Sequence, residues 1–191
     1  MLFRSDTTNS THSAALPFDV VVGSGQSSSN GNDTIKLDTG SGNLGISATT
    51  PTIVYGLNGN DKIDATGMTA NVWFVGGPGA DTMTGGSGVD TYLYAATSES
   101  KPCNGNFDTI NNFAPGTDKI DFSGVTPAHL SFQTSLTSQG KVAADSITVI
   151  SGSNTEVYVN TTTGSEAVGS ANMQIHLTGH LTLQDSDFFH S

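Results

Sequence analysis

Two consecutive copies of a nine-residue pattern occupy residues 76–93 and constrain the fold more than any other feature of the sequence. Each copy reads Gly-Gly-x-Gly-x-Asp-x-U-x, where U is a large apolar residue, Met83 in the first copy and Tyr92 in the second. Paired glycines allow positive φ angles in a tight turn and direct main-chain carbonyls toward a shared point between neighbouring turns. The pattern therefore predicts glycine turns that each lead into a short strand with one apolar side chain pointing inward.

An aspartate follows the glycines in each copy and adds a negative charge to the same turn. A hard divalent cation such as calcium prefers about six to eight oxygens from carboxylates and carbonyls, which stacked turns of this kind can supply. We therefore expect calcium ions to be bound by the turns of both copies. The predicted metal ligands of the two copies are Asp81, Asp90, Gly76, Gly77, Gly79, Gly85, Gly86 and Gly88.

Two weaker copies of the pattern lie upstream. Residues 56–63 add Gly56, Gly59 and Asp61 to the predicted calcium ligands, and residues 30–35 add Asp33. Gly, Asn and Asp are also the usual turn-forming residues, so an ordinary hairpin turn is an equally good interpretation of the segment around Asp33.

Glu99 and Asp108 continue the nine-residue spacing that separates Asp81 from Asp90. If one nonapeptide makes half a coil, residues eighteen apart stack on the same edge, so Asp81 would face Glu99 and Asp90 would face Asp108. Each pair is predicted to hold a calcium ion. Neither Glu99 nor Asp108 follows a pair of glycines, so a solvated loop carboxylate is the alternative interpretation of both residues.

The register of the coils shows two irregularities. Asp61 lies twenty residues before Asp81, two more than one coil, and the surplus is expected within residues 65–75. Asn71 falls close to the acidic position one coil before Asp90, where a neutral amide predicts an empty or weak calcium level. The apolar run Trp-Phe-Val at residues 73–75 is expected to pack inside the coils.

Charge and cysteine content limit the possible partners. Seventeen acidic residues against six basic ones give a net charge of −11, which argues against nucleic acid or anionic lipid and favours cations. Without cations the stacked carboxylates would repel one another, so the coils are expected to be loose at low calcium and to order when it binds. Cys103 is the single cysteine, which excludes an intramolecular disulfide. Residues 1–17 lack the apolar core of a signal peptide, and no segment is long enough to cross a membrane.

Three further blocks follow one another after the repeats: DTYLY at residues 90–94, FDTINNF at 107–113 and GTDKIDFS at 116–123. With the tandem repeats they resemble the C-terminal domain of serralysin-type metalloproteases, and they are also similar to the R-modules of secreted alginate epimerases. The resemblance runs from about residue 56 to the end and implies an RTX calcium-binding β-roll followed by a β-sandwich cap. It also implies an uncleaved C-terminal signal for type I secretion, although here His190 and Ser191 follow the terminal apolar Phe189.

The expected fold is therefore all-β: a parallel β-roll of nonapeptide repeats, capped by a C-terminal β-sandwich-like segment. Residues 1–27 are expected to form a flexible lead, residues 28–113 the calcium-binding roll, and residues 114–191 the cap with the secretion signal. Clusters of β-forming residues predict strands at residues 146–150, 156–159 and 173–177.

No catalytic motif was found. The resembled proteases need a zinc-binding H-E-x-x-H helix, and this string does not occur in the chain. We expect a non-catalytic calcium-binding module that folds outside the cell and is the tail of a larger secreted protein such as a metalloprotease. A structural or adhesive calcium-dependent domain of the cell surface is the alternative. The expected partners are calcium ions, the type I secretion apparatus, and an upstream catalytic domain or a polysaccharide, with no nucleic acid and no membrane insertion.

Overall fold

Short strands that alternate between two sheets make up most of the chain. The structure, a computed structural model, describes residues 4–5, 11–12, 19–22, 31–37, 47–102, 105–126 and 129–190. The first sheet contains β1 (Arg4–Ser5), β2 (Thr11–His12), β3 (Asp19–Val22), β5 (Thr52–Tyr55), β7 (Val72–Val75), β9 (Thr91–Leu93), β11 (Lys119–Asp121) and β18 (Phe188–Phe189), in this order. The second contains β12 (Ser131–Gln133), β14 (Ser146–Ser151), β15 (Thr155–Asn160), β17 (Met173–Leu177), β10 (Asp108–Asn111), β8 (Thr82–Thr84), β6 (Lys62–Asp64) and β4 (Thr34–Lys36).

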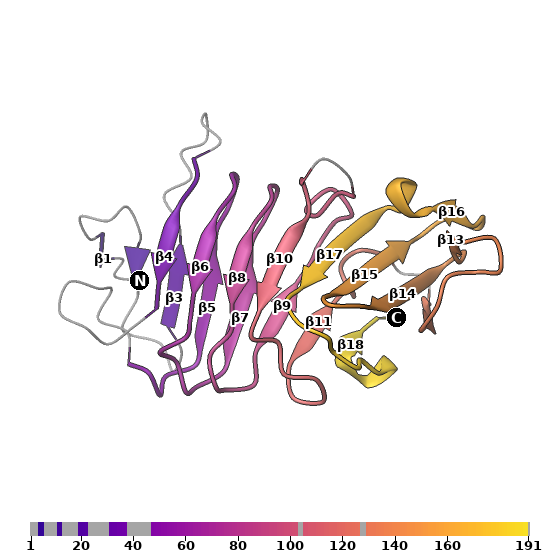
Figure 1. Ribbon diagram of the computed structural model, residues 1–191. Coiled ribbons are helices and arrows are strands. Elements are labelled where there is room, and N and C mark those ends of the chain that lie inside the picture. Colours follow the sequence, from indigo (N-terminus) through magenta and orange to yellow (C-terminus); the bar gives the residue numbers. More distant parts are fainter. Residues whose placement is uncertain are drawn as a thin grey trace.

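The alternation of strands winds the chain into a parallel β-roll. Strands β3, β5, β7, β9, β11 and β18 pair in parallel, and so do β4, β6, β8, β10 and β17. Figure 1 shows these strands as successive rungs from the N-terminal to the C-terminal half of the molecule. The expected all-β parallel roll is confirmed.

The C-terminal part departs from the parallel pattern. β15 pairs antiparallel with both β17 and β14, which gives the end of the second sheet the antiparallel character expected of a cap. A small third sheet joins β13 (Lys141–Val142) to β16 (Glu166–Ala167), and two short 3-10 helices, η1 (Val168–Ser170) and η2 (Asp185–Asp187), complete the described elements. The strands predicted at residues 146–150, 156–159 and 173–177 are β14, β15 and β17.

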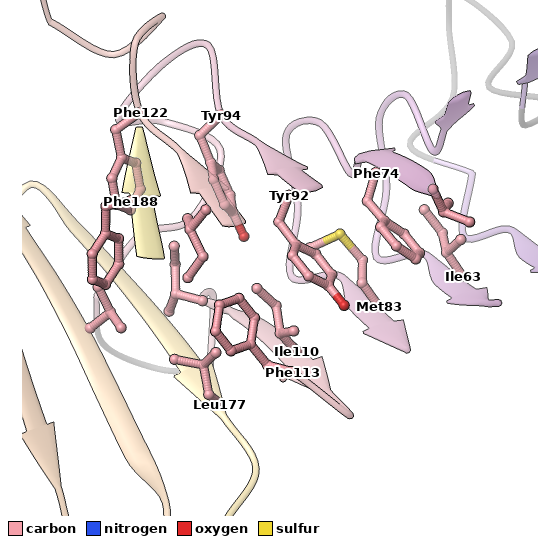
Figure 2. Packing of buried hydrophobic residues seen from close by; sticks show 14 of the residues in the cluster. Ile63, Phe74, Met83, Tyr92, Tyr94, Ile110, Phe113, Phe122, Leu177 and Phe188 are labelled. Atoms are coloured by element: carbon pink, nitrogen blue, oxygen red, sulfur yellow. The ribbon is translucent and has the colours of Figure 1, made fainter. Parts of the chain in front are cut away.

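The core lies between the two sheets and follows from the alternation of side chains along each strand. The first sheet contributes Val54, Phe74, Tyr92, Ile120 and Phe188, and the second contributes Ile35, Ile63, Met83, Ile110 and Leu177, each at most 5% exposed. Figure 2 shows several of these side chains meeting between the strands. The rings of Phe74 and Tyr92 stack with centroids 4.7 Å apart, so successive coils contact one another through aromatic faces as well as through main-chain bonds.

The prediction for the run at residues 73–75 is only partly correct. Phe74 is fully buried, but Trp73 and Val75 are half-buried on the outer face of β7. The physical reason is the two-residue period of a strand, which sends neighbours of an inward side chain outward whatever their hydrophobicity. Met83 and Tyr92 point inward as the nonapeptide pattern predicts.

Coil length varies because the turns, and not the strands, absorb extra residues. The register pairs Ile53 with Trp73, twenty residues on, and Trp73 with Thr91, eighteen residues on. Lys62 also pairs with a residue twenty positions later, Thr82. Only residues 62–72 belong to both twenty-residue coils and not to the eighteen-residue coil. The two extra residues therefore lie within residues 62–72, which overlap the expected segment 65–75.

The sheets do not break at the expected domain boundaries. β3 lies inside residues 1–27, where only the backbone of β1, β2 and β3 is described and the rest of the expected lead lies outside the described residues. β11, β17 and β18 extend the two sheets across the expected boundary at residues 113 and 114. One hydrophobic cluster runs from Ile35 to Phe188. In the described part of the chain, no helix combines the length and apolar character that a membrane crossing requires.

Truncation of Phe74 is expected to be far more damaging than truncation of its neighbour Trp73. Phe74→Ala would leave a cavity beside Tyr92 and lower the free energy of unfolding by about 3–5 kcal/mol. Trp73→Ala removes a side chain that is half-buried on the outer face, so its cost should be clearly smaller. Denaturant unfolding of both variants checks this order, and an equal loss would contradict the inward placement of Phe74.

Candidate metal centre

Acidic turns lie along both edges of the roll. The turns that enter β4, β6, β8 and β10 end at Asp33, Asp61, Asp81 and Asp108, and they form what we call the Asp81 edge. The opposite edge, which we call the Asp90 edge, contains the turns that enter β7, β9 and β11 and the turn that leads through η2 into β18. These turns end at Asn71, Asp90, Asp118 and Asp187. Of the predicted glycine ligands, Gly56, Gly59, Gly76, Gly77 and Gly79 lie on the Asp81 edge, and Gly85, Gly86 and Gly88 lie on the Asp90 edge.

On the Asp81 edge the carboxylates form a ladder from coil to coil. Asp61 Oδ1 accepts the amide of Asp33, Asp81 Oδ1 accepts the amide of Asp61, and Asp108 Oδ1 accepts the amide of Asp81, each at 2.8 Å. Asp33 is therefore part of the stacked array. The ladder places one carboxylate above the next along this edge.

The second carboxylate oxygen distinguishes two rungs of this ladder. The Oδ2 atoms of Asp61 and Asp81 are buried and accept no hydrogen bond from the described residues, although the residues are only 2% and 1% exposed. A buried charged oxygen without a donor is costly, and each such atom in a folded protein needs a physical explanation. A cation would be a suitable partner for a carboxylate oxygen in this position.

Main-chain carbonyls approach the turns that contain these oxygens. A Cβ placed on Gly56 would lie 2.5 Å from Asp61 Oδ2 and 2.6 Å from the carbonyl oxygen of Gly76, so these two oxygens border the same space. In the next coil a Cβ on Gly77 would collide with the carbonyl oxygen of Leu57, and one on Gly79 with that of Gly59. Only glycine lets the turns approach so closely.

The turns of the Asp81 edge also hold unusual backbone conformations. Gly77 has φ 97° and Leu57, at the equivalent position one coil earlier, has φ 80°. Positive φ is uncommon for a residue with a side chain and carries strain, and such strain clusters at binding sites. The same conformation at both positions indicates a turn shape that this edge repeats.

Burial and neighbouring negative charge raise the pKa values of the aspartates on this edge. The pKa of Asp81 is raised to about 7, first by burial and then by the charges of Asp61 and Glu99. Burial also raises the pKa of Asp61 and, to well above its ordinary range, that of Asp108. Without a cation this edge therefore disfavours the charged state of its carboxylates.

The structure changes the predicted pairing of Glu99 and Asp108 with the tandem aspartates. Asp108 lies next to Asp81 and not opposite Asp90, because more residues separate β9 from β10 than the nonapeptide allows. Its Oδ2 accepts a hydrogen bond of 2.9 Å from the Tyr94 hydroxyl, so both Asp108 oxygens have donors. Glu99 lies in the connection from β9 to β10, on the Asp81 edge, where its charge contributes to the raised pKa of Asp81, and its Oε2 accepts the amide of Ala95 at 3.0 Å.

On the Asp90 edge the carboxylates are satisfied by main-chain amides. Asp90 Oδ2 accepts the amide of Gly86 at 2.8 Å and its Oδ1 accepts that of Val72 at 3.0 Å. Burial raises the pKa of Asp90 to about 6. One coil earlier, as predicted, the Asn71 side chain stands near the acidic position, where its Oδ1 accepts the amide of Val89 at 3.1 Å.

Sequence reasoning missed two members of the Asp90 edge, Asp118 and Asp187. Asp118 Oδ1 accepts the amide of Asp90 at 3.0 Å, and Asp187 Oδ1 accepts that of Gly116 at 2.7 Å. Both residues lie within motifs that carry the family resemblance, and a glycine stands two positions before Asp118 as it does before Asp81 and Asp90. That shared glycine was the available signal.

The donor set decides which ion would fit. Across the described residues, no group of three or more His, Cys, Asp or Glu side chains gathers in a way that could hold a metal. An ion on the Asp81 edge would therefore depend on main-chain carbonyls as much as on carboxylates. Such an all-oxygen set suits calcium and is unlike the nitrogen and sulfur ligands that zinc takes in proteins.

Two parallel sheets joined by stacked glycine–aspartate turns define the chain as a nonapeptide-repeat β-roll domain. The chain belongs to the family described as peptidase M10 serralysin C terminal, which matches it over residues 3–190. Similar solved structures include the AlgE6R2 subunit of the Azotobacter vinelandii mannuronan C5-epimerase, with 22% identity, 93% of this chain and 94% of that chain covered, and a TM-score of 0.48. The AlgE6R3 subunit has 21% identity, coverages of 81% and 77%, and a TM-score of 0.44. A search of curated proteins finds no match to this chain.

The metal-free chain is expected to lose stability as the pH rises from about 4 to about 7. Folding raises the pKa of Asp81 to about 7, so in this window the folded state binds more protons than the unfolded state and its advantage shrinks with rising pH. Thermal unfolding in calcium-free buffer at several pH values measures the effect. Asp81→Asn should weaken the dependence, and a midpoint that rises with pH would contradict the assignment.

Proposed function

We propose that this chain is a non-catalytic calcium-binding module whose calcium sites lie on the Asp81 edge of the β-roll. The observation that carries the proposal is the pair of buried Oδ2 atoms of Asp61 and Asp81, which lack hydrogen-bond donors among the described residues; that of Asp61 borders the carbonyl oxygen of Gly76. Membership of the serralysin C-terminal family supports the same reading.

The residues that would hold calcium come from consecutive coils. Asp61 and Asp81 would supply carboxylate oxygens, and the turns that contain Leu57, Gly59 and Gly76 would supply carbonyl oxygens. Bound calcium would neutralise the stacked charges and cross-link neighbouring turns. Asp33 and Glu99 are further candidate ligands at the two ends of this stretch, whereas the Tyr94 hydrogen bond makes Asp108 a less suitable one.

Calcium would act mainly on the stability of the fold. An ion that binds the folded turns and not the unfolded chain stabilises the folded state by mass action. Sites of this kind on extracellular modules commonly have affinities of about 0.1–1 mM, well above resting cytosolic calcium concentrations. The roll would therefore remain loose inside a cell and order outside it.

Calcium titration of the whole chain tests this proposal. Isothermal titration of chelator-stripped protein, with circular dichroism in parallel, should show calcium binding and a gain of β signal. Asp81→Asn removes a charge and should weaken calcium binding by about tenfold or more at the sites that it borders. Thermal unfolding of the same variant should show a smaller stabilisation by calcium.

Asp64→Asn is the matched control. Asp64 lies on the outer side of β6 and its Oδ1 accepts hydrogen bonds from the Thr66 amide and hydroxyl, so the variant changes the same net charge away from the Asp81 edge. Its calcium affinity should equal that of the unaltered chain. Equal behaviour of Asp81→Asn and Asp64→Asn, or no binding by either, would refute the proposed site.

We also propose that the module is exported by a type I apparatus and works outside the cell, as the tail of a larger secreted protein. The support is the family membership and the acidic and apolar residues at positions 185–189. Fusion of residues 142–191 to a reporter should send the reporter into the medium only when the apparatus is present. Retention of the reporter in the cell would contradict this part of the proposal and favour a structural role at the cell surface.

A further inference from the structure

The two tandem nonapeptides share a sequence pattern but form different turns. In the first copy the second glycine, Gly77, has φ 97°, whereas its counterpart in the second copy, Gly86, is not in the left-handed region. The amide of Gly86 donates a hydrogen bond to Asp90 Oδ2 at 2.8 Å. The corresponding oxygen in the first copy, Asp81 Oδ2, receives no such bond from the described residues.

The same closure recurs along the Asp90 edge. Asp118 Oδ2 accepts the amide of Ala114, four residues earlier, at 2.8 Å. Asp187 Oδ2 accepts the amide of Gln184, three residues earlier, at 2.8 Å. In each of the three carboxylates, one oxygen thus accepts a hydrogen bond from a main-chain amide of its own turn.

The other oxygen of each carboxylate reaches a different segment. The Oδ1 atoms of Asp90, Asp118 and Asp187 accept the amides of Val72, Asp90 and Gly116 respectively. The partners are 18, 28 and 71 residues apart, so this edge ties together distant parts of the chain up to its last strand. Every carboxylate oxygen of these three residues has a protein donor.

A lysine supplies positive charge at the end of this edge. Lys119 Nζ lies 3.8 Å from Asp187 Oδ1 and donates a hydrogen bond of 2.8 Å to the carbonyl oxygen of Ser186. Its charge also lowers the pKa of Asp118, although burial of that carboxyl has the larger, opposite effect. On the Asp81 edge the charges that act on Asp81 and Asp108 all come from other carboxylates.

We propose that the Asp90 edge is a calcium-independent clamp, in which Asp90, Asp118 and Asp187 fasten the coils and the C-terminal strand through main-chain amides. The inference that calcium occupies only the opposite edge rests on the proposed function. The clamp itself does not, because every carboxylate oxygen of Asp90, Asp118 and Asp187 has a main-chain donor without an ion. The second nonapeptide of the tandem is then a structural turn despite its match to a metal-binding pattern.

Amide hydrogen exchange of the complete chain, followed by NMR, tests the clamp directly. In chelator, the amides of Gly86, Ala114 and Gly116 should already be protected, and calcium should change their protection by less than about tenfold. The amides of Asp61 and Asp81, which bridge the coils of the other edge, should gain protection when calcium is added. Exchange of the Gly86, Ala114 and Gly116 amides that becomes slow only with calcium would overturn the inference.

Calcium stoichiometry of two matched variants gives the second measurement. Asp90→Asn should bind as many calcium ions as the unaltered chain, with affinities within about threefold, while Asp81→Asn should lose binding. Loss of an ion in Asp90→Asn would overturn the inference. If Asp90→Asn does not fold, Asp187→Asn takes its place, with unchanged stoichiometry and faster exchange at Gly116 as the expected result and a lost ion as the contrary one.

Failure of the two proposals can be told apart. If calcium changes neither the amide exchange rates nor the heat of titration while the amides of Gly86, Ala114 and Gly116 remain protected, the proposed calcium function fails and the clamp stands. If calcium binds but these amides need it for protection, the clamp fails and the calcium function stands.

Discussion

One hydrogen bond, repeated between coils, holds this roll in register: an aspartate carboxylate oxygen accepts a main-chain amide from the coil before it. The bonds from Asp33 to Asp61, from Asp61 to Asp81 and from Asp90 to Asp118 are all of this kind. A charged acceptor in a buried setting makes such a bond worth about 1.5–3 kcal/mol. In the same buried setting a carboxylate oxygen without a donor is costly, so the partner of the second oxygen of each aspartate determines whether the protein alone satisfies that turn.

The two edges deal with that second oxygen differently. On the Asp90 edge an amide of the same turn supplies the hydrogen bond, and the turn is complete. On the Asp81 edge the positive φ of Leu57 and Gly77 goes together with buried oxygens that have no donor among the described residues. Burial and neighbouring charge raise the pKa values of aspartates on both edges, but among Asp61, Asp81, Asp90, Asp118 and Asp187 only Asp61 and Asp81 leave a buried carboxylate oxygen without a donor, which a bound cation would offset.

The architecture could be predicted from the sequence because each nonapeptide contains a turn and a strand in which the position of the inward-pointing residue is fixed. Met83 and Tyr92 point inward as predicted, and the surplus residues lie in the segment that spacing indicated. The nine-residue spacing predicted the wrong neighbours where the connection between two strands was not a nonapeptide. The greater number of residues between β9 and β10 places Asp108 on the Asp81 edge, and the coil neighbour of Asp90 is Asp118.

Two other features could not be read from the pattern. Trp73 lies on the outer face because strand alternation overrides hydrophobicity, and one residue of phase separates it from the buried Phe74. The different turns at Gly77 and Gly86 are beyond sequence reasoning of this kind, because both are the second glycine of the same motif. Their conformations depend on contacts with the preceding coil, which the motif does not encode.

The placement of β18 has a consequence for chains that are shortened at their C-terminal end. β18 pairs with β11 although Phe188 and Ile120 are 68 residues apart, and the amide of Phe122 donates to the carbonyl oxygen of Phe189. Removal of this strand would leave β11 as an open sheet edge with unpaired main-chain groups beside the exposed aromatic core. Such an edge is a template for strand addition by another molecule, so proteolytic loss of a few terminal residues would replace the two-residue edge strand β18 by the longer β11 and favour intermolecular pairing and aggregation.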